Sequence, residues 1–100
     1  MSASTYLPVP LDTSMVVLSP DLAALTEKLA ENAHELWSQE RISQGWKCGP
    51  ERSDARKEHP GLVPYDELPK PEQQFDRNTA LGTLKAILAM GYQILPPPMK

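Results

Sequence analysis

The middle of this chain constrains its fold most, because residues 46–70 show neither helical nor strand periodicity between two flanks of helical pattern. A segment of this length without regular structure is uncommon inside a small domain, and it is usually functional. Four apolar residues are expected to tie its second half to the core: Leu62, Val63, Tyr65 and Leu68. The chain is therefore expected to be two helices joined by one long irregular loop.

The first helix is expected over residues 20–44. Ser19-Pro20-Asp21 supplies a capping hydroxyl, a proline at the first helical position and an acid in the first turn. Gly45 is a natural end. Apolar residues at helical spacing predict a stripe that faces the core, with His34, Trp37 and Arg41 along one edge: Leu22, Leu25, Leu29, Ala33 and Leu36.

The second helix is expected over residues 71–90, from Pro71-Glu72 to the stop at Gly91. Its last turns are apolar nearly all round, so several sides must be covered. One side carries Phe75, Thr79, Gly82, Ala86, Ala89 and Met90, and the other carries Ala80, Leu81, Leu84, Ile87 and Leu88. The cover comes either from the rest of the chain or from a second chain. The expected fold class is all-α, with two main antiparallel helices.

Three regions are expected along the chain. Residues 1–18 form an arm that Pro8 and Pro10 hold extended, and its apolar end, residues 15–18, is expected to pack on the second helix. Residues 19–94 form the domain, and residues 95–100 form a proline-rich tail.

Composition narrows the class of protein. A net charge of −3 argues against nucleic acid or an anionic membrane as a partner. A single cysteine makes no internal disulfide, which fits a reducing compartment. No secretory leader is apparent, and the longest apolar run, residues 86–90, falls far short of the ~20 residues of a membrane span. We expect a cytoplasmic protein.

Catalytic and metal-binding patterns are incomplete. His34-Glu35-Leu36-Trp37-Ser38 begins like a zinc helix but has serine where the second histidine would stand. Cys48 and His59 could be a nucleophile and a base, but no third group to orient them is evident. We therefore expect no enzyme activity, no metal site and no cofactor.

Trp46 is the candidate binding residue. It follows the glycine that ends the first helix, and Arg41, Arg52 and His59 are nearby in the sequence or in the same loop. An aromatic face among basic groups suits a planar anionic ligand, whose ring stacks while its phosphates meet the cations. In the alternative interpretation, Trp46 packs against the second helix and the arginines pair with acids. The residues leave both open.

The order of the motifs resembles the ryanodine-receptor repeat domain, closest to its single-copy prokaryotic type. The resemblance covers about residues 6–94 and is carried by these segments: Tyr6-Leu7-Pro8-Val9-Pro10-Leu11-Asp12-Thr13-Ser14, Leu29-Ala30-Glu31-Asn32-Ala33-His34-Glu35-Leu36-Trp37, Arg41-Ile42, Gly45-Trp46, Gly49-Pro50-Glu51-Arg52, His59-Pro60-Gly61-Leu62-Val63-Pro64-Tyr65, Asp76-Arg77, Thr83-Leu84-Lys85 and Leu88-Ala89-Met90-Gly91-Tyr92.

The resemblance implies an α-helical, non-catalytic interaction or regulatory module, with adenine nucleotides or small molecules bound near the tryptophan that matches Trp46. Three departures from the family bear on this. Cys48 stands where an aromatic residue is usual, Gly61 replaces a frequent cysteine, and Lys70-Pro71 replaces a more acidic helix entry. The channel activity of the receptors does not carry over, because nothing here spans a membrane.

Together these observations predict a cytosolic ligand-binding module that senses an adenine-type nucleotide through the Trp46 loop. The alternative is a protein-interaction or self-association module. In that case Leu81, Leu84 and Leu88 of the second helix would form an exposed patch that drives a homodimer.

Overall fold

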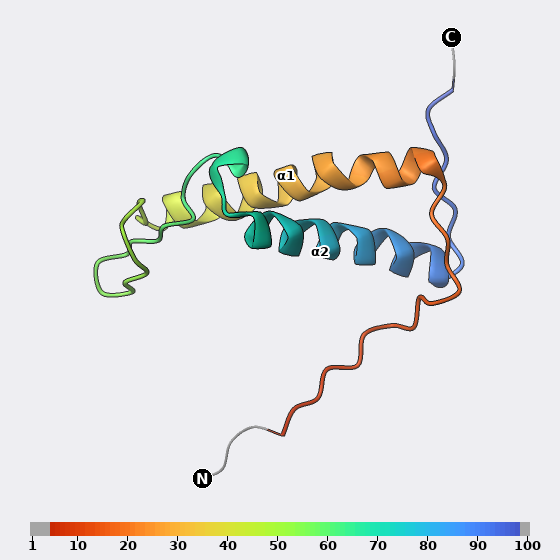
Figure 1. Cartoon of the computed structure of the whole chain (residues 1–100), viewed down its shortest axis with the longest axis horizontal. Helices are drawn as coiled ribbons and strands as arrows, with labels where there is room; N and C mark the ends of the chain where they lie inside the picture. The colour runs from red at the N-terminus through yellow and green to blue at the C-terminus, as the bar shows by residue number, and fades with distance from the viewer. Residues whose placement is uncertain (1–4, 99–100) are drawn as a thin grey trace.

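Two long helices lie side by side and antiparallel, and a long loop extends beyond one end of the pair (Figure 1). The computed structural model describes residues 5–98. It contains α1 (Pro20–Ser43), a short 3-10 helix η1 (Tyr65–Glu67) and α2 (Lys70–Ala89). Within the described residues, extended pairing is limited to two isolated bridges in the loop. The expected all-α class is confirmed.

Local chemistry at the helix ends explains their bounds, which differ by at most one residue from the predicted ones. The Ser19 hydroxyl accepts a hydrogen bond from the Leu22 N–H at 3.3 Å, and Pro20 follows it as the first helical residue. Gly45 and Gly91 adopt φ values of 92° and 95°, the left-handed conformation that ends a helix at little cost for glycine.

The core is small and depends on the loop. Ala30 of α1 is fully buried, and it clusters with Tyr65 and Leu68 of the loop, against which Val63 packs. Burial raises the pKa of the Tyr65 phenol. The Gln73 side-chain amide donates hydrogen bonds to the Tyr65 and Leu68 carbonyl oxygens, both at 3.1 Å. The prediction that the second half of the loop anchors to the core is confirmed at Tyr65 and Leu68.

The predicted core stripe of the first helix is wrong in part. Leu25, Leu29 and Leu36 are 41%, 38% and 57% exposed, whereas the buried residues of α1 are Leu22, Ala30 and His34. The loop sets this register, because it packs its aromatic and apolar residues over the face that carries Ala30 and His34. Helical periodicity in the sequence could not show which face the loop would cover.

The leucines of α2 that the self-association alternative required to be exposed lie on the packed side of the helix. Leu84 is 6% exposed, and Leu81 and Leu88 are half-buried. These leucines therefore belong to the packed side of α2 and do not form the exposed patch that was expected of them. The outward side instead exposes Phe75 and Met90, at 69% and 58%.

The N-terminal arm does not cover α2 in the way the sequence predicted. Met15 and Val17 are 91% and 88% exposed, while Val16 and Leu18 are half-buried. A turn over residues 13–16, closed by a hydrogen bond from the Val16 N–H to the Thr13 carbonyl at 3.0 Å, directs the preceding residues away from the helices (Figure 1).

Candidate functional site

Arg41 lies between the two tryptophans of the chain. Its guanidinium carbon is 5.3 Å from the centroid of the Trp46 ring and 5.9 Å from that of Trp37. The Trp46 N–H also donates to the Arg41 carbonyl oxygen at 3.0 Å. Arginine over an indole face is a favourable cation–π arrangement. One face of Trp46 is therefore in contact with Arg41, and the whole residue is half-buried.

Trp37 connects this pair to two histidines. The His59 ring meets Trp37 edge-on, with centroids 5.0 Å apart, and the His34 ring stacks beside Trp37 at 5.7 Å. His34 Nε2 lies 2.7 Å from the Val63 carbonyl oxygen. A carbonyl only accepts, so Nε2 must carry the proton. The buried His34 thereby fastens the loop to α1.

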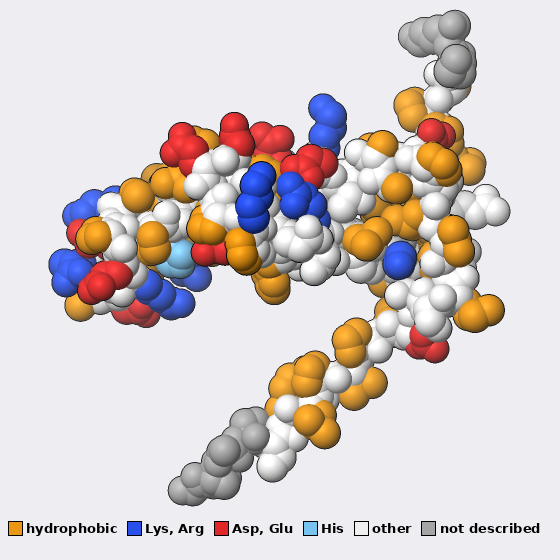
Figure 2. All heavy atoms as spheres, viewed as in Figure 1, with side chains coloured by type: hydrophobic (Ala, Val, Ile, Leu, Met, Phe, Trp, Pro, Cys, Tyr) orange, Lys and Arg blue, Asp and Glu red, His pale blue; other side chains and the backbone are white. Residues whose placement is uncertain are grey.

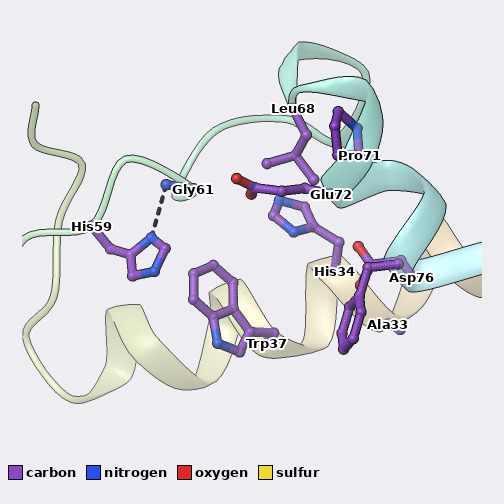
Figure 3. A pocket seen from close by; sticks show the side chains of 10 residues that line it. Ala33, His34, Trp37, His59, Gly61, Leu68, Pro71, Glu72 and Asp76 are labelled. Atoms are coloured by element: carbon purple, nitrogen blue, oxygen red, sulfur yellow. Dashed lines mark hydrogen bonds between the residues drawn. The ribbon is translucent and has the colours of Figure 1, made fainter. Parts of the chain in front are cut away.

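A pocket of about 490 Å³ opens beside Trp37, between the middle of α1, the loop at His59 and the first turns of α2 (Figure 3). Its lining is mainly aromatic and apolar: Ala33, His34, Trp37, His59, Gly61, Leu68, Pro71, Glu72, Phe75 and Asp76. A concave site with aromatic walls and a few polar groups is the usual form of a small-molecule site.

Two carboxylates give the pocket its charge. Glu72 and Asp76 are one helical turn apart on α2 and both line the cavity. Within residues 5–98, neither carboxylate has a hydrogen bond or an ion pair. Such groups attract cations and N–H donors and oppose phosphate inside the pocket.

Gly61 determines how much room the pocket has beside Trp37. A Cβ atom at this position would lie 3.1 Å from the His59 ring and 3.6 Å from Trp37. The Gly61 N–H donates to His59 Nδ1 at 2.9 Å, which fixes the orientation of that ring (Figure 3). Because Gly61 has no side chain, the loop backbone can lie close to both rings without crowding them.

The structure brings together only part of the predicted site. Arg41 and Trp46 are in contact, and His59 lies on the far side of Trp37, in the pocket wall. Arg52 instead pairs with Asp54 at 2.9 Å in the exposed loop. This pairing follows the alternative interpretation, in which loop arginines meet acids.

Trp37 is the pocket residue that sequence reasoning missed as a ligand contact. The helical spacing had placed it beside His34 and Arg41, and the structure confirms that neighbourhood. Its position at the edge of a helical apolar stripe favoured a core role. Only the fold of the loop shows that one side of Trp37 faces a cavity.

The fold and the pocket define a small all-α domain in which two antiparallel helices and an ordered loop line an open aromatic pocket. The family model of the RyR domain matches residues 6–96, which is most of the chain, and the chain belongs to that family. The resemblance seen in the sequence is thus confirmed. Among residues 5–98, no helix is long and apolar enough to cross a membrane, and no cluster of three or more potential ligands suits a metal ion.

Proposed function

We propose that this domain is a non-catalytic binding module that takes an adenine-type ring in the pocket beside Trp37. The observation that carries the proposal is the cavity itself, in which aromatic faces surround a space that also holds two carboxylates without partners. Membership of the RyR domain family supports a regulatory role of this kind. The Trp46 loop then has a supporting function, because it positions Arg41.

Charge sets the orientation of the ligand. An adenine ring presents an exocyclic amine, whose N–H groups can donate to Glu72 or Asp76. The same carboxylates repel phosphates, which would extend from the pocket toward Arg41. The Arg41 side chain lies over Trp37 and is hydrogen-bonded to the Gln44 side chain at 3.5 Å, and within the described residues it has no carboxylate partner.

In this arrangement the base contributes more to the binding affinity than the phosphates do. Stacking contributes about 1–3 kcal/mol per base, and hydrogen bonds to charged groups about 1.5–3 kcal/mol. After the cost of ordering the ligand, an open site of this size is expected to bind with about millimolar to micromolar affinity. Adenosine should therefore bind about as well as ATP, and added salt should have little effect.

Isothermal titration calorimetry with adenine, adenosine, AMP and ATP tests the proposal. Phe75→Ala is the informative variant, because Phe75 lines the pocket yet is 69% exposed, so its truncation should weaken binding and leave the melting temperature almost unchanged. Trp37→Phe should retain part of the affinity. Trp46→Ala is the matched control and should still bind.

Two results would contradict the proposal. Loss of binding in Trp46→Ala together with full binding in Phe75→Ala would place the ligand on the loop tryptophan. No heat with any of the four compounds at millimolar concentration would exclude the adenine-type ligand. Gly61→Ala adds a further check, since its methyl group would crowd His59 and narrow the pocket without changing any charge.

A further inference from the structure

The N-terminal arm presents an apolar segment to solvent. Residues 6–11 read Tyr-Leu-Pro-Val-Pro-Leu and contain no charged side chain. Leu7 and Val9 are 80% and 88% exposed, and Leu11 is 58% exposed. Figure 2 shows the hydrophobic side chains that follow one another along this projecting arm. Contiguous exposed apolar surface of this kind marks an interaction site in a soluble protein.

The arm is held straight and directed away from its own domain. Pro8 and Pro10 restrict their own backbone and that of the residues before them to extended conformations. At its base, the Ser14 N–H donates to the Asp12 carboxylate at 3.0 Å, next to the turn over residues 13–16. The base is thus fixed by local hydrogen bonds, and the arm is ordered for binding before a partner arrives.

The outward side of α2 offers a surface of matching character. On its second half, an open cleft of about 300 Å³ lies between small, uncharged residues of α2 and the base of the arm, and Lys85 is the one charged residue of that half. The lining residues on α2 are Asn78, Thr79, Gly82, Thr83 and Ala86, and those on the arm are Pro10, Leu11 and Thr13. Nothing lies within 4 Å of where a Cβ of Gly82 would be. The surface is therefore accessible for another apolar segment.

We propose that this domain forms a two-fold dimer by reciprocal exchange of its arms, with residues 5–11 of each copy lying along residues 78–86 of the other. A second copy is the occupant because each chain carries both an arm that leaves its own helix and a free face beside the base of that arm. Two-fold symmetry pairs both arms with both faces at once, and exchange of an identical element is a low-cost route to a dimer. Residues 5–11 carry no charge, and Lys85, the one charged residue of the receiving stretch, does not line the cleft.

Light scattering coupled to size exclusion tests the dimer. The full chain at high micromolar concentration should have twice the mass of one chain, and deletion of residues 1–11 should give a single chain. Gly82→Arg should also give a monomer, because its side chain fills the receiving face while the open space around Gly82 leaves the fold intact. Ala24→Arg, at an exposed position of α1, is the matched control and should remain a dimer.

Disulfide trapping distinguishes exchange from packing of the arm on its own helix. In a Cys48→Ser background, a mixture of Leu7→Cys and Thr83→Cys chains should form a covalent heterodimer under mild oxidation. If the arm folds back, the double variant gives only a monomer with an internal disulfide, and the mixture gives no heterodimer. A monomeric wild-type chain, or a dimer that survives both arm deletion and Gly82→Arg, would also overturn the proposal.

Discussion

The long loop and the N-terminal arm are both rich in proline and poor in regular structure, yet they have opposite relations to the two helices. The loop supplies Tyr65 and Leu68 to the core, and both are almost completely buried. The arm leaves Met15 and Val17 almost completely exposed. Irregular backbone alone therefore does not decide whether a segment belongs to the core.

Backbone hydrogen bonds separate the two segments. The loop closes on itself through the Lys47 N–H to the Lys57 carbonyl at 2.9 Å and the His59 N–H to the Lys47 carbonyl at 3.0 Å. It is also attached to α1 through His34. In the arm, the hydrogen bonds of residues 12–16 are local and none reaches a helix. An irregular segment becomes part of a core when its polar backbone is satisfied while its apolar side chains are buried.

The largest expected effect is at Tyr65. Tyr65→Ala removes a buried aromatic side chain between the loop and α1, and it should lower the free energy of unfolding by about 3–5 kcal/mol. Urea denaturation followed by circular dichroism measures the change, and Tyr65→Phe, which keeps the ring, is the control. A stability loss as small as that of Tyr65→Phe would show that the loop is not part of the core.

A smaller loss is expected when the attachment between α1 and the loop is removed. His34→Phe keeps a ring in the same place but leaves the Val63 carbonyl without its donor, which should cost about 1–3 kcal/mol of unfolding free energy. Glu35→Gln, at the exposed neighbouring position, should cause no measurable loss in the same denaturation experiment. Equal stability of the two variants would mean that this hydrogen bond does not hold the loop.

The ion pair between Glu27 and Arg77 joins α1 to α2 directly. The hydrogen bond from Arg77 lowers the pKa of Glu27 below the ordinary glutamate value of about 4.3. The stabilisation from this pair is therefore complete above that value and is lost as the pH falls through the lower pKa of the folded state. Melting temperatures between neutral and acidic pH should show this decline, and Glu27→Gln should reduce it.

Glu31→Gln, on the same helix and also exposed to solvent, is the control for that titration. An acid-induced decline in Glu27→Gln that equals the wild-type decline would show that the pair contributes nothing. The effect should be smaller than that at His34, because both side chains of the ion pair are partly exposed and solvent screens them.

The smallest effect is expected in the arm. Met15→Ser and Val17→Ser should each change the free energy of unfolding by no more than about 0.5 kcal/mol, since both side chains are already in water. The free energy of unfolding is measured at low protein concentration, where association between chains contributes least. A loss comparable to that of Leu68→Ser would restore the expectation that the arm packs on α2.

The sequence was most informative where structure is local. Ser19-Pro20 and Gly45 predicted both ends of α1 to within one residue, because capping depends on neighbouring residues alone. The sequence was least informative about which face of each helix is buried. Leu25 and Leu36 are better hydrophobic candidates than His34, but the loop covers His34 and leaves the leucines exposed. That choice depends on contacts between residues about 30 positions apart, as in the bond from His34 to Val63.

The candidate site shows the same contrast between local and long-range information. Arg41 and Trp46 are close in sequence, and the sequence predicted that they lie near each other, as the contact shows. The pocket at Trp37 needs Gly61 of the loop and Glu72 of α2 at the same place, and no local pattern joins them. Trp46 is a candidate from the sequence because it follows a helix-ending glycine, whereas Trp37 lies beside a helical apolar stripe, where a core role is expected.

The placement of one guanidinium between two indoles has an optical consequence. Trp37 and Trp46 are the only tryptophans of the chain, and both contact Arg41, so ultraviolet-excited emission of the wild-type protein mixes pocket and loop. Trp46→Phe leaves a single emitter in the pocket wall. Because indole emission depends on local polarity and on quenching by stacked rings, that variant would report occupancy of its own cavity without an attached dye.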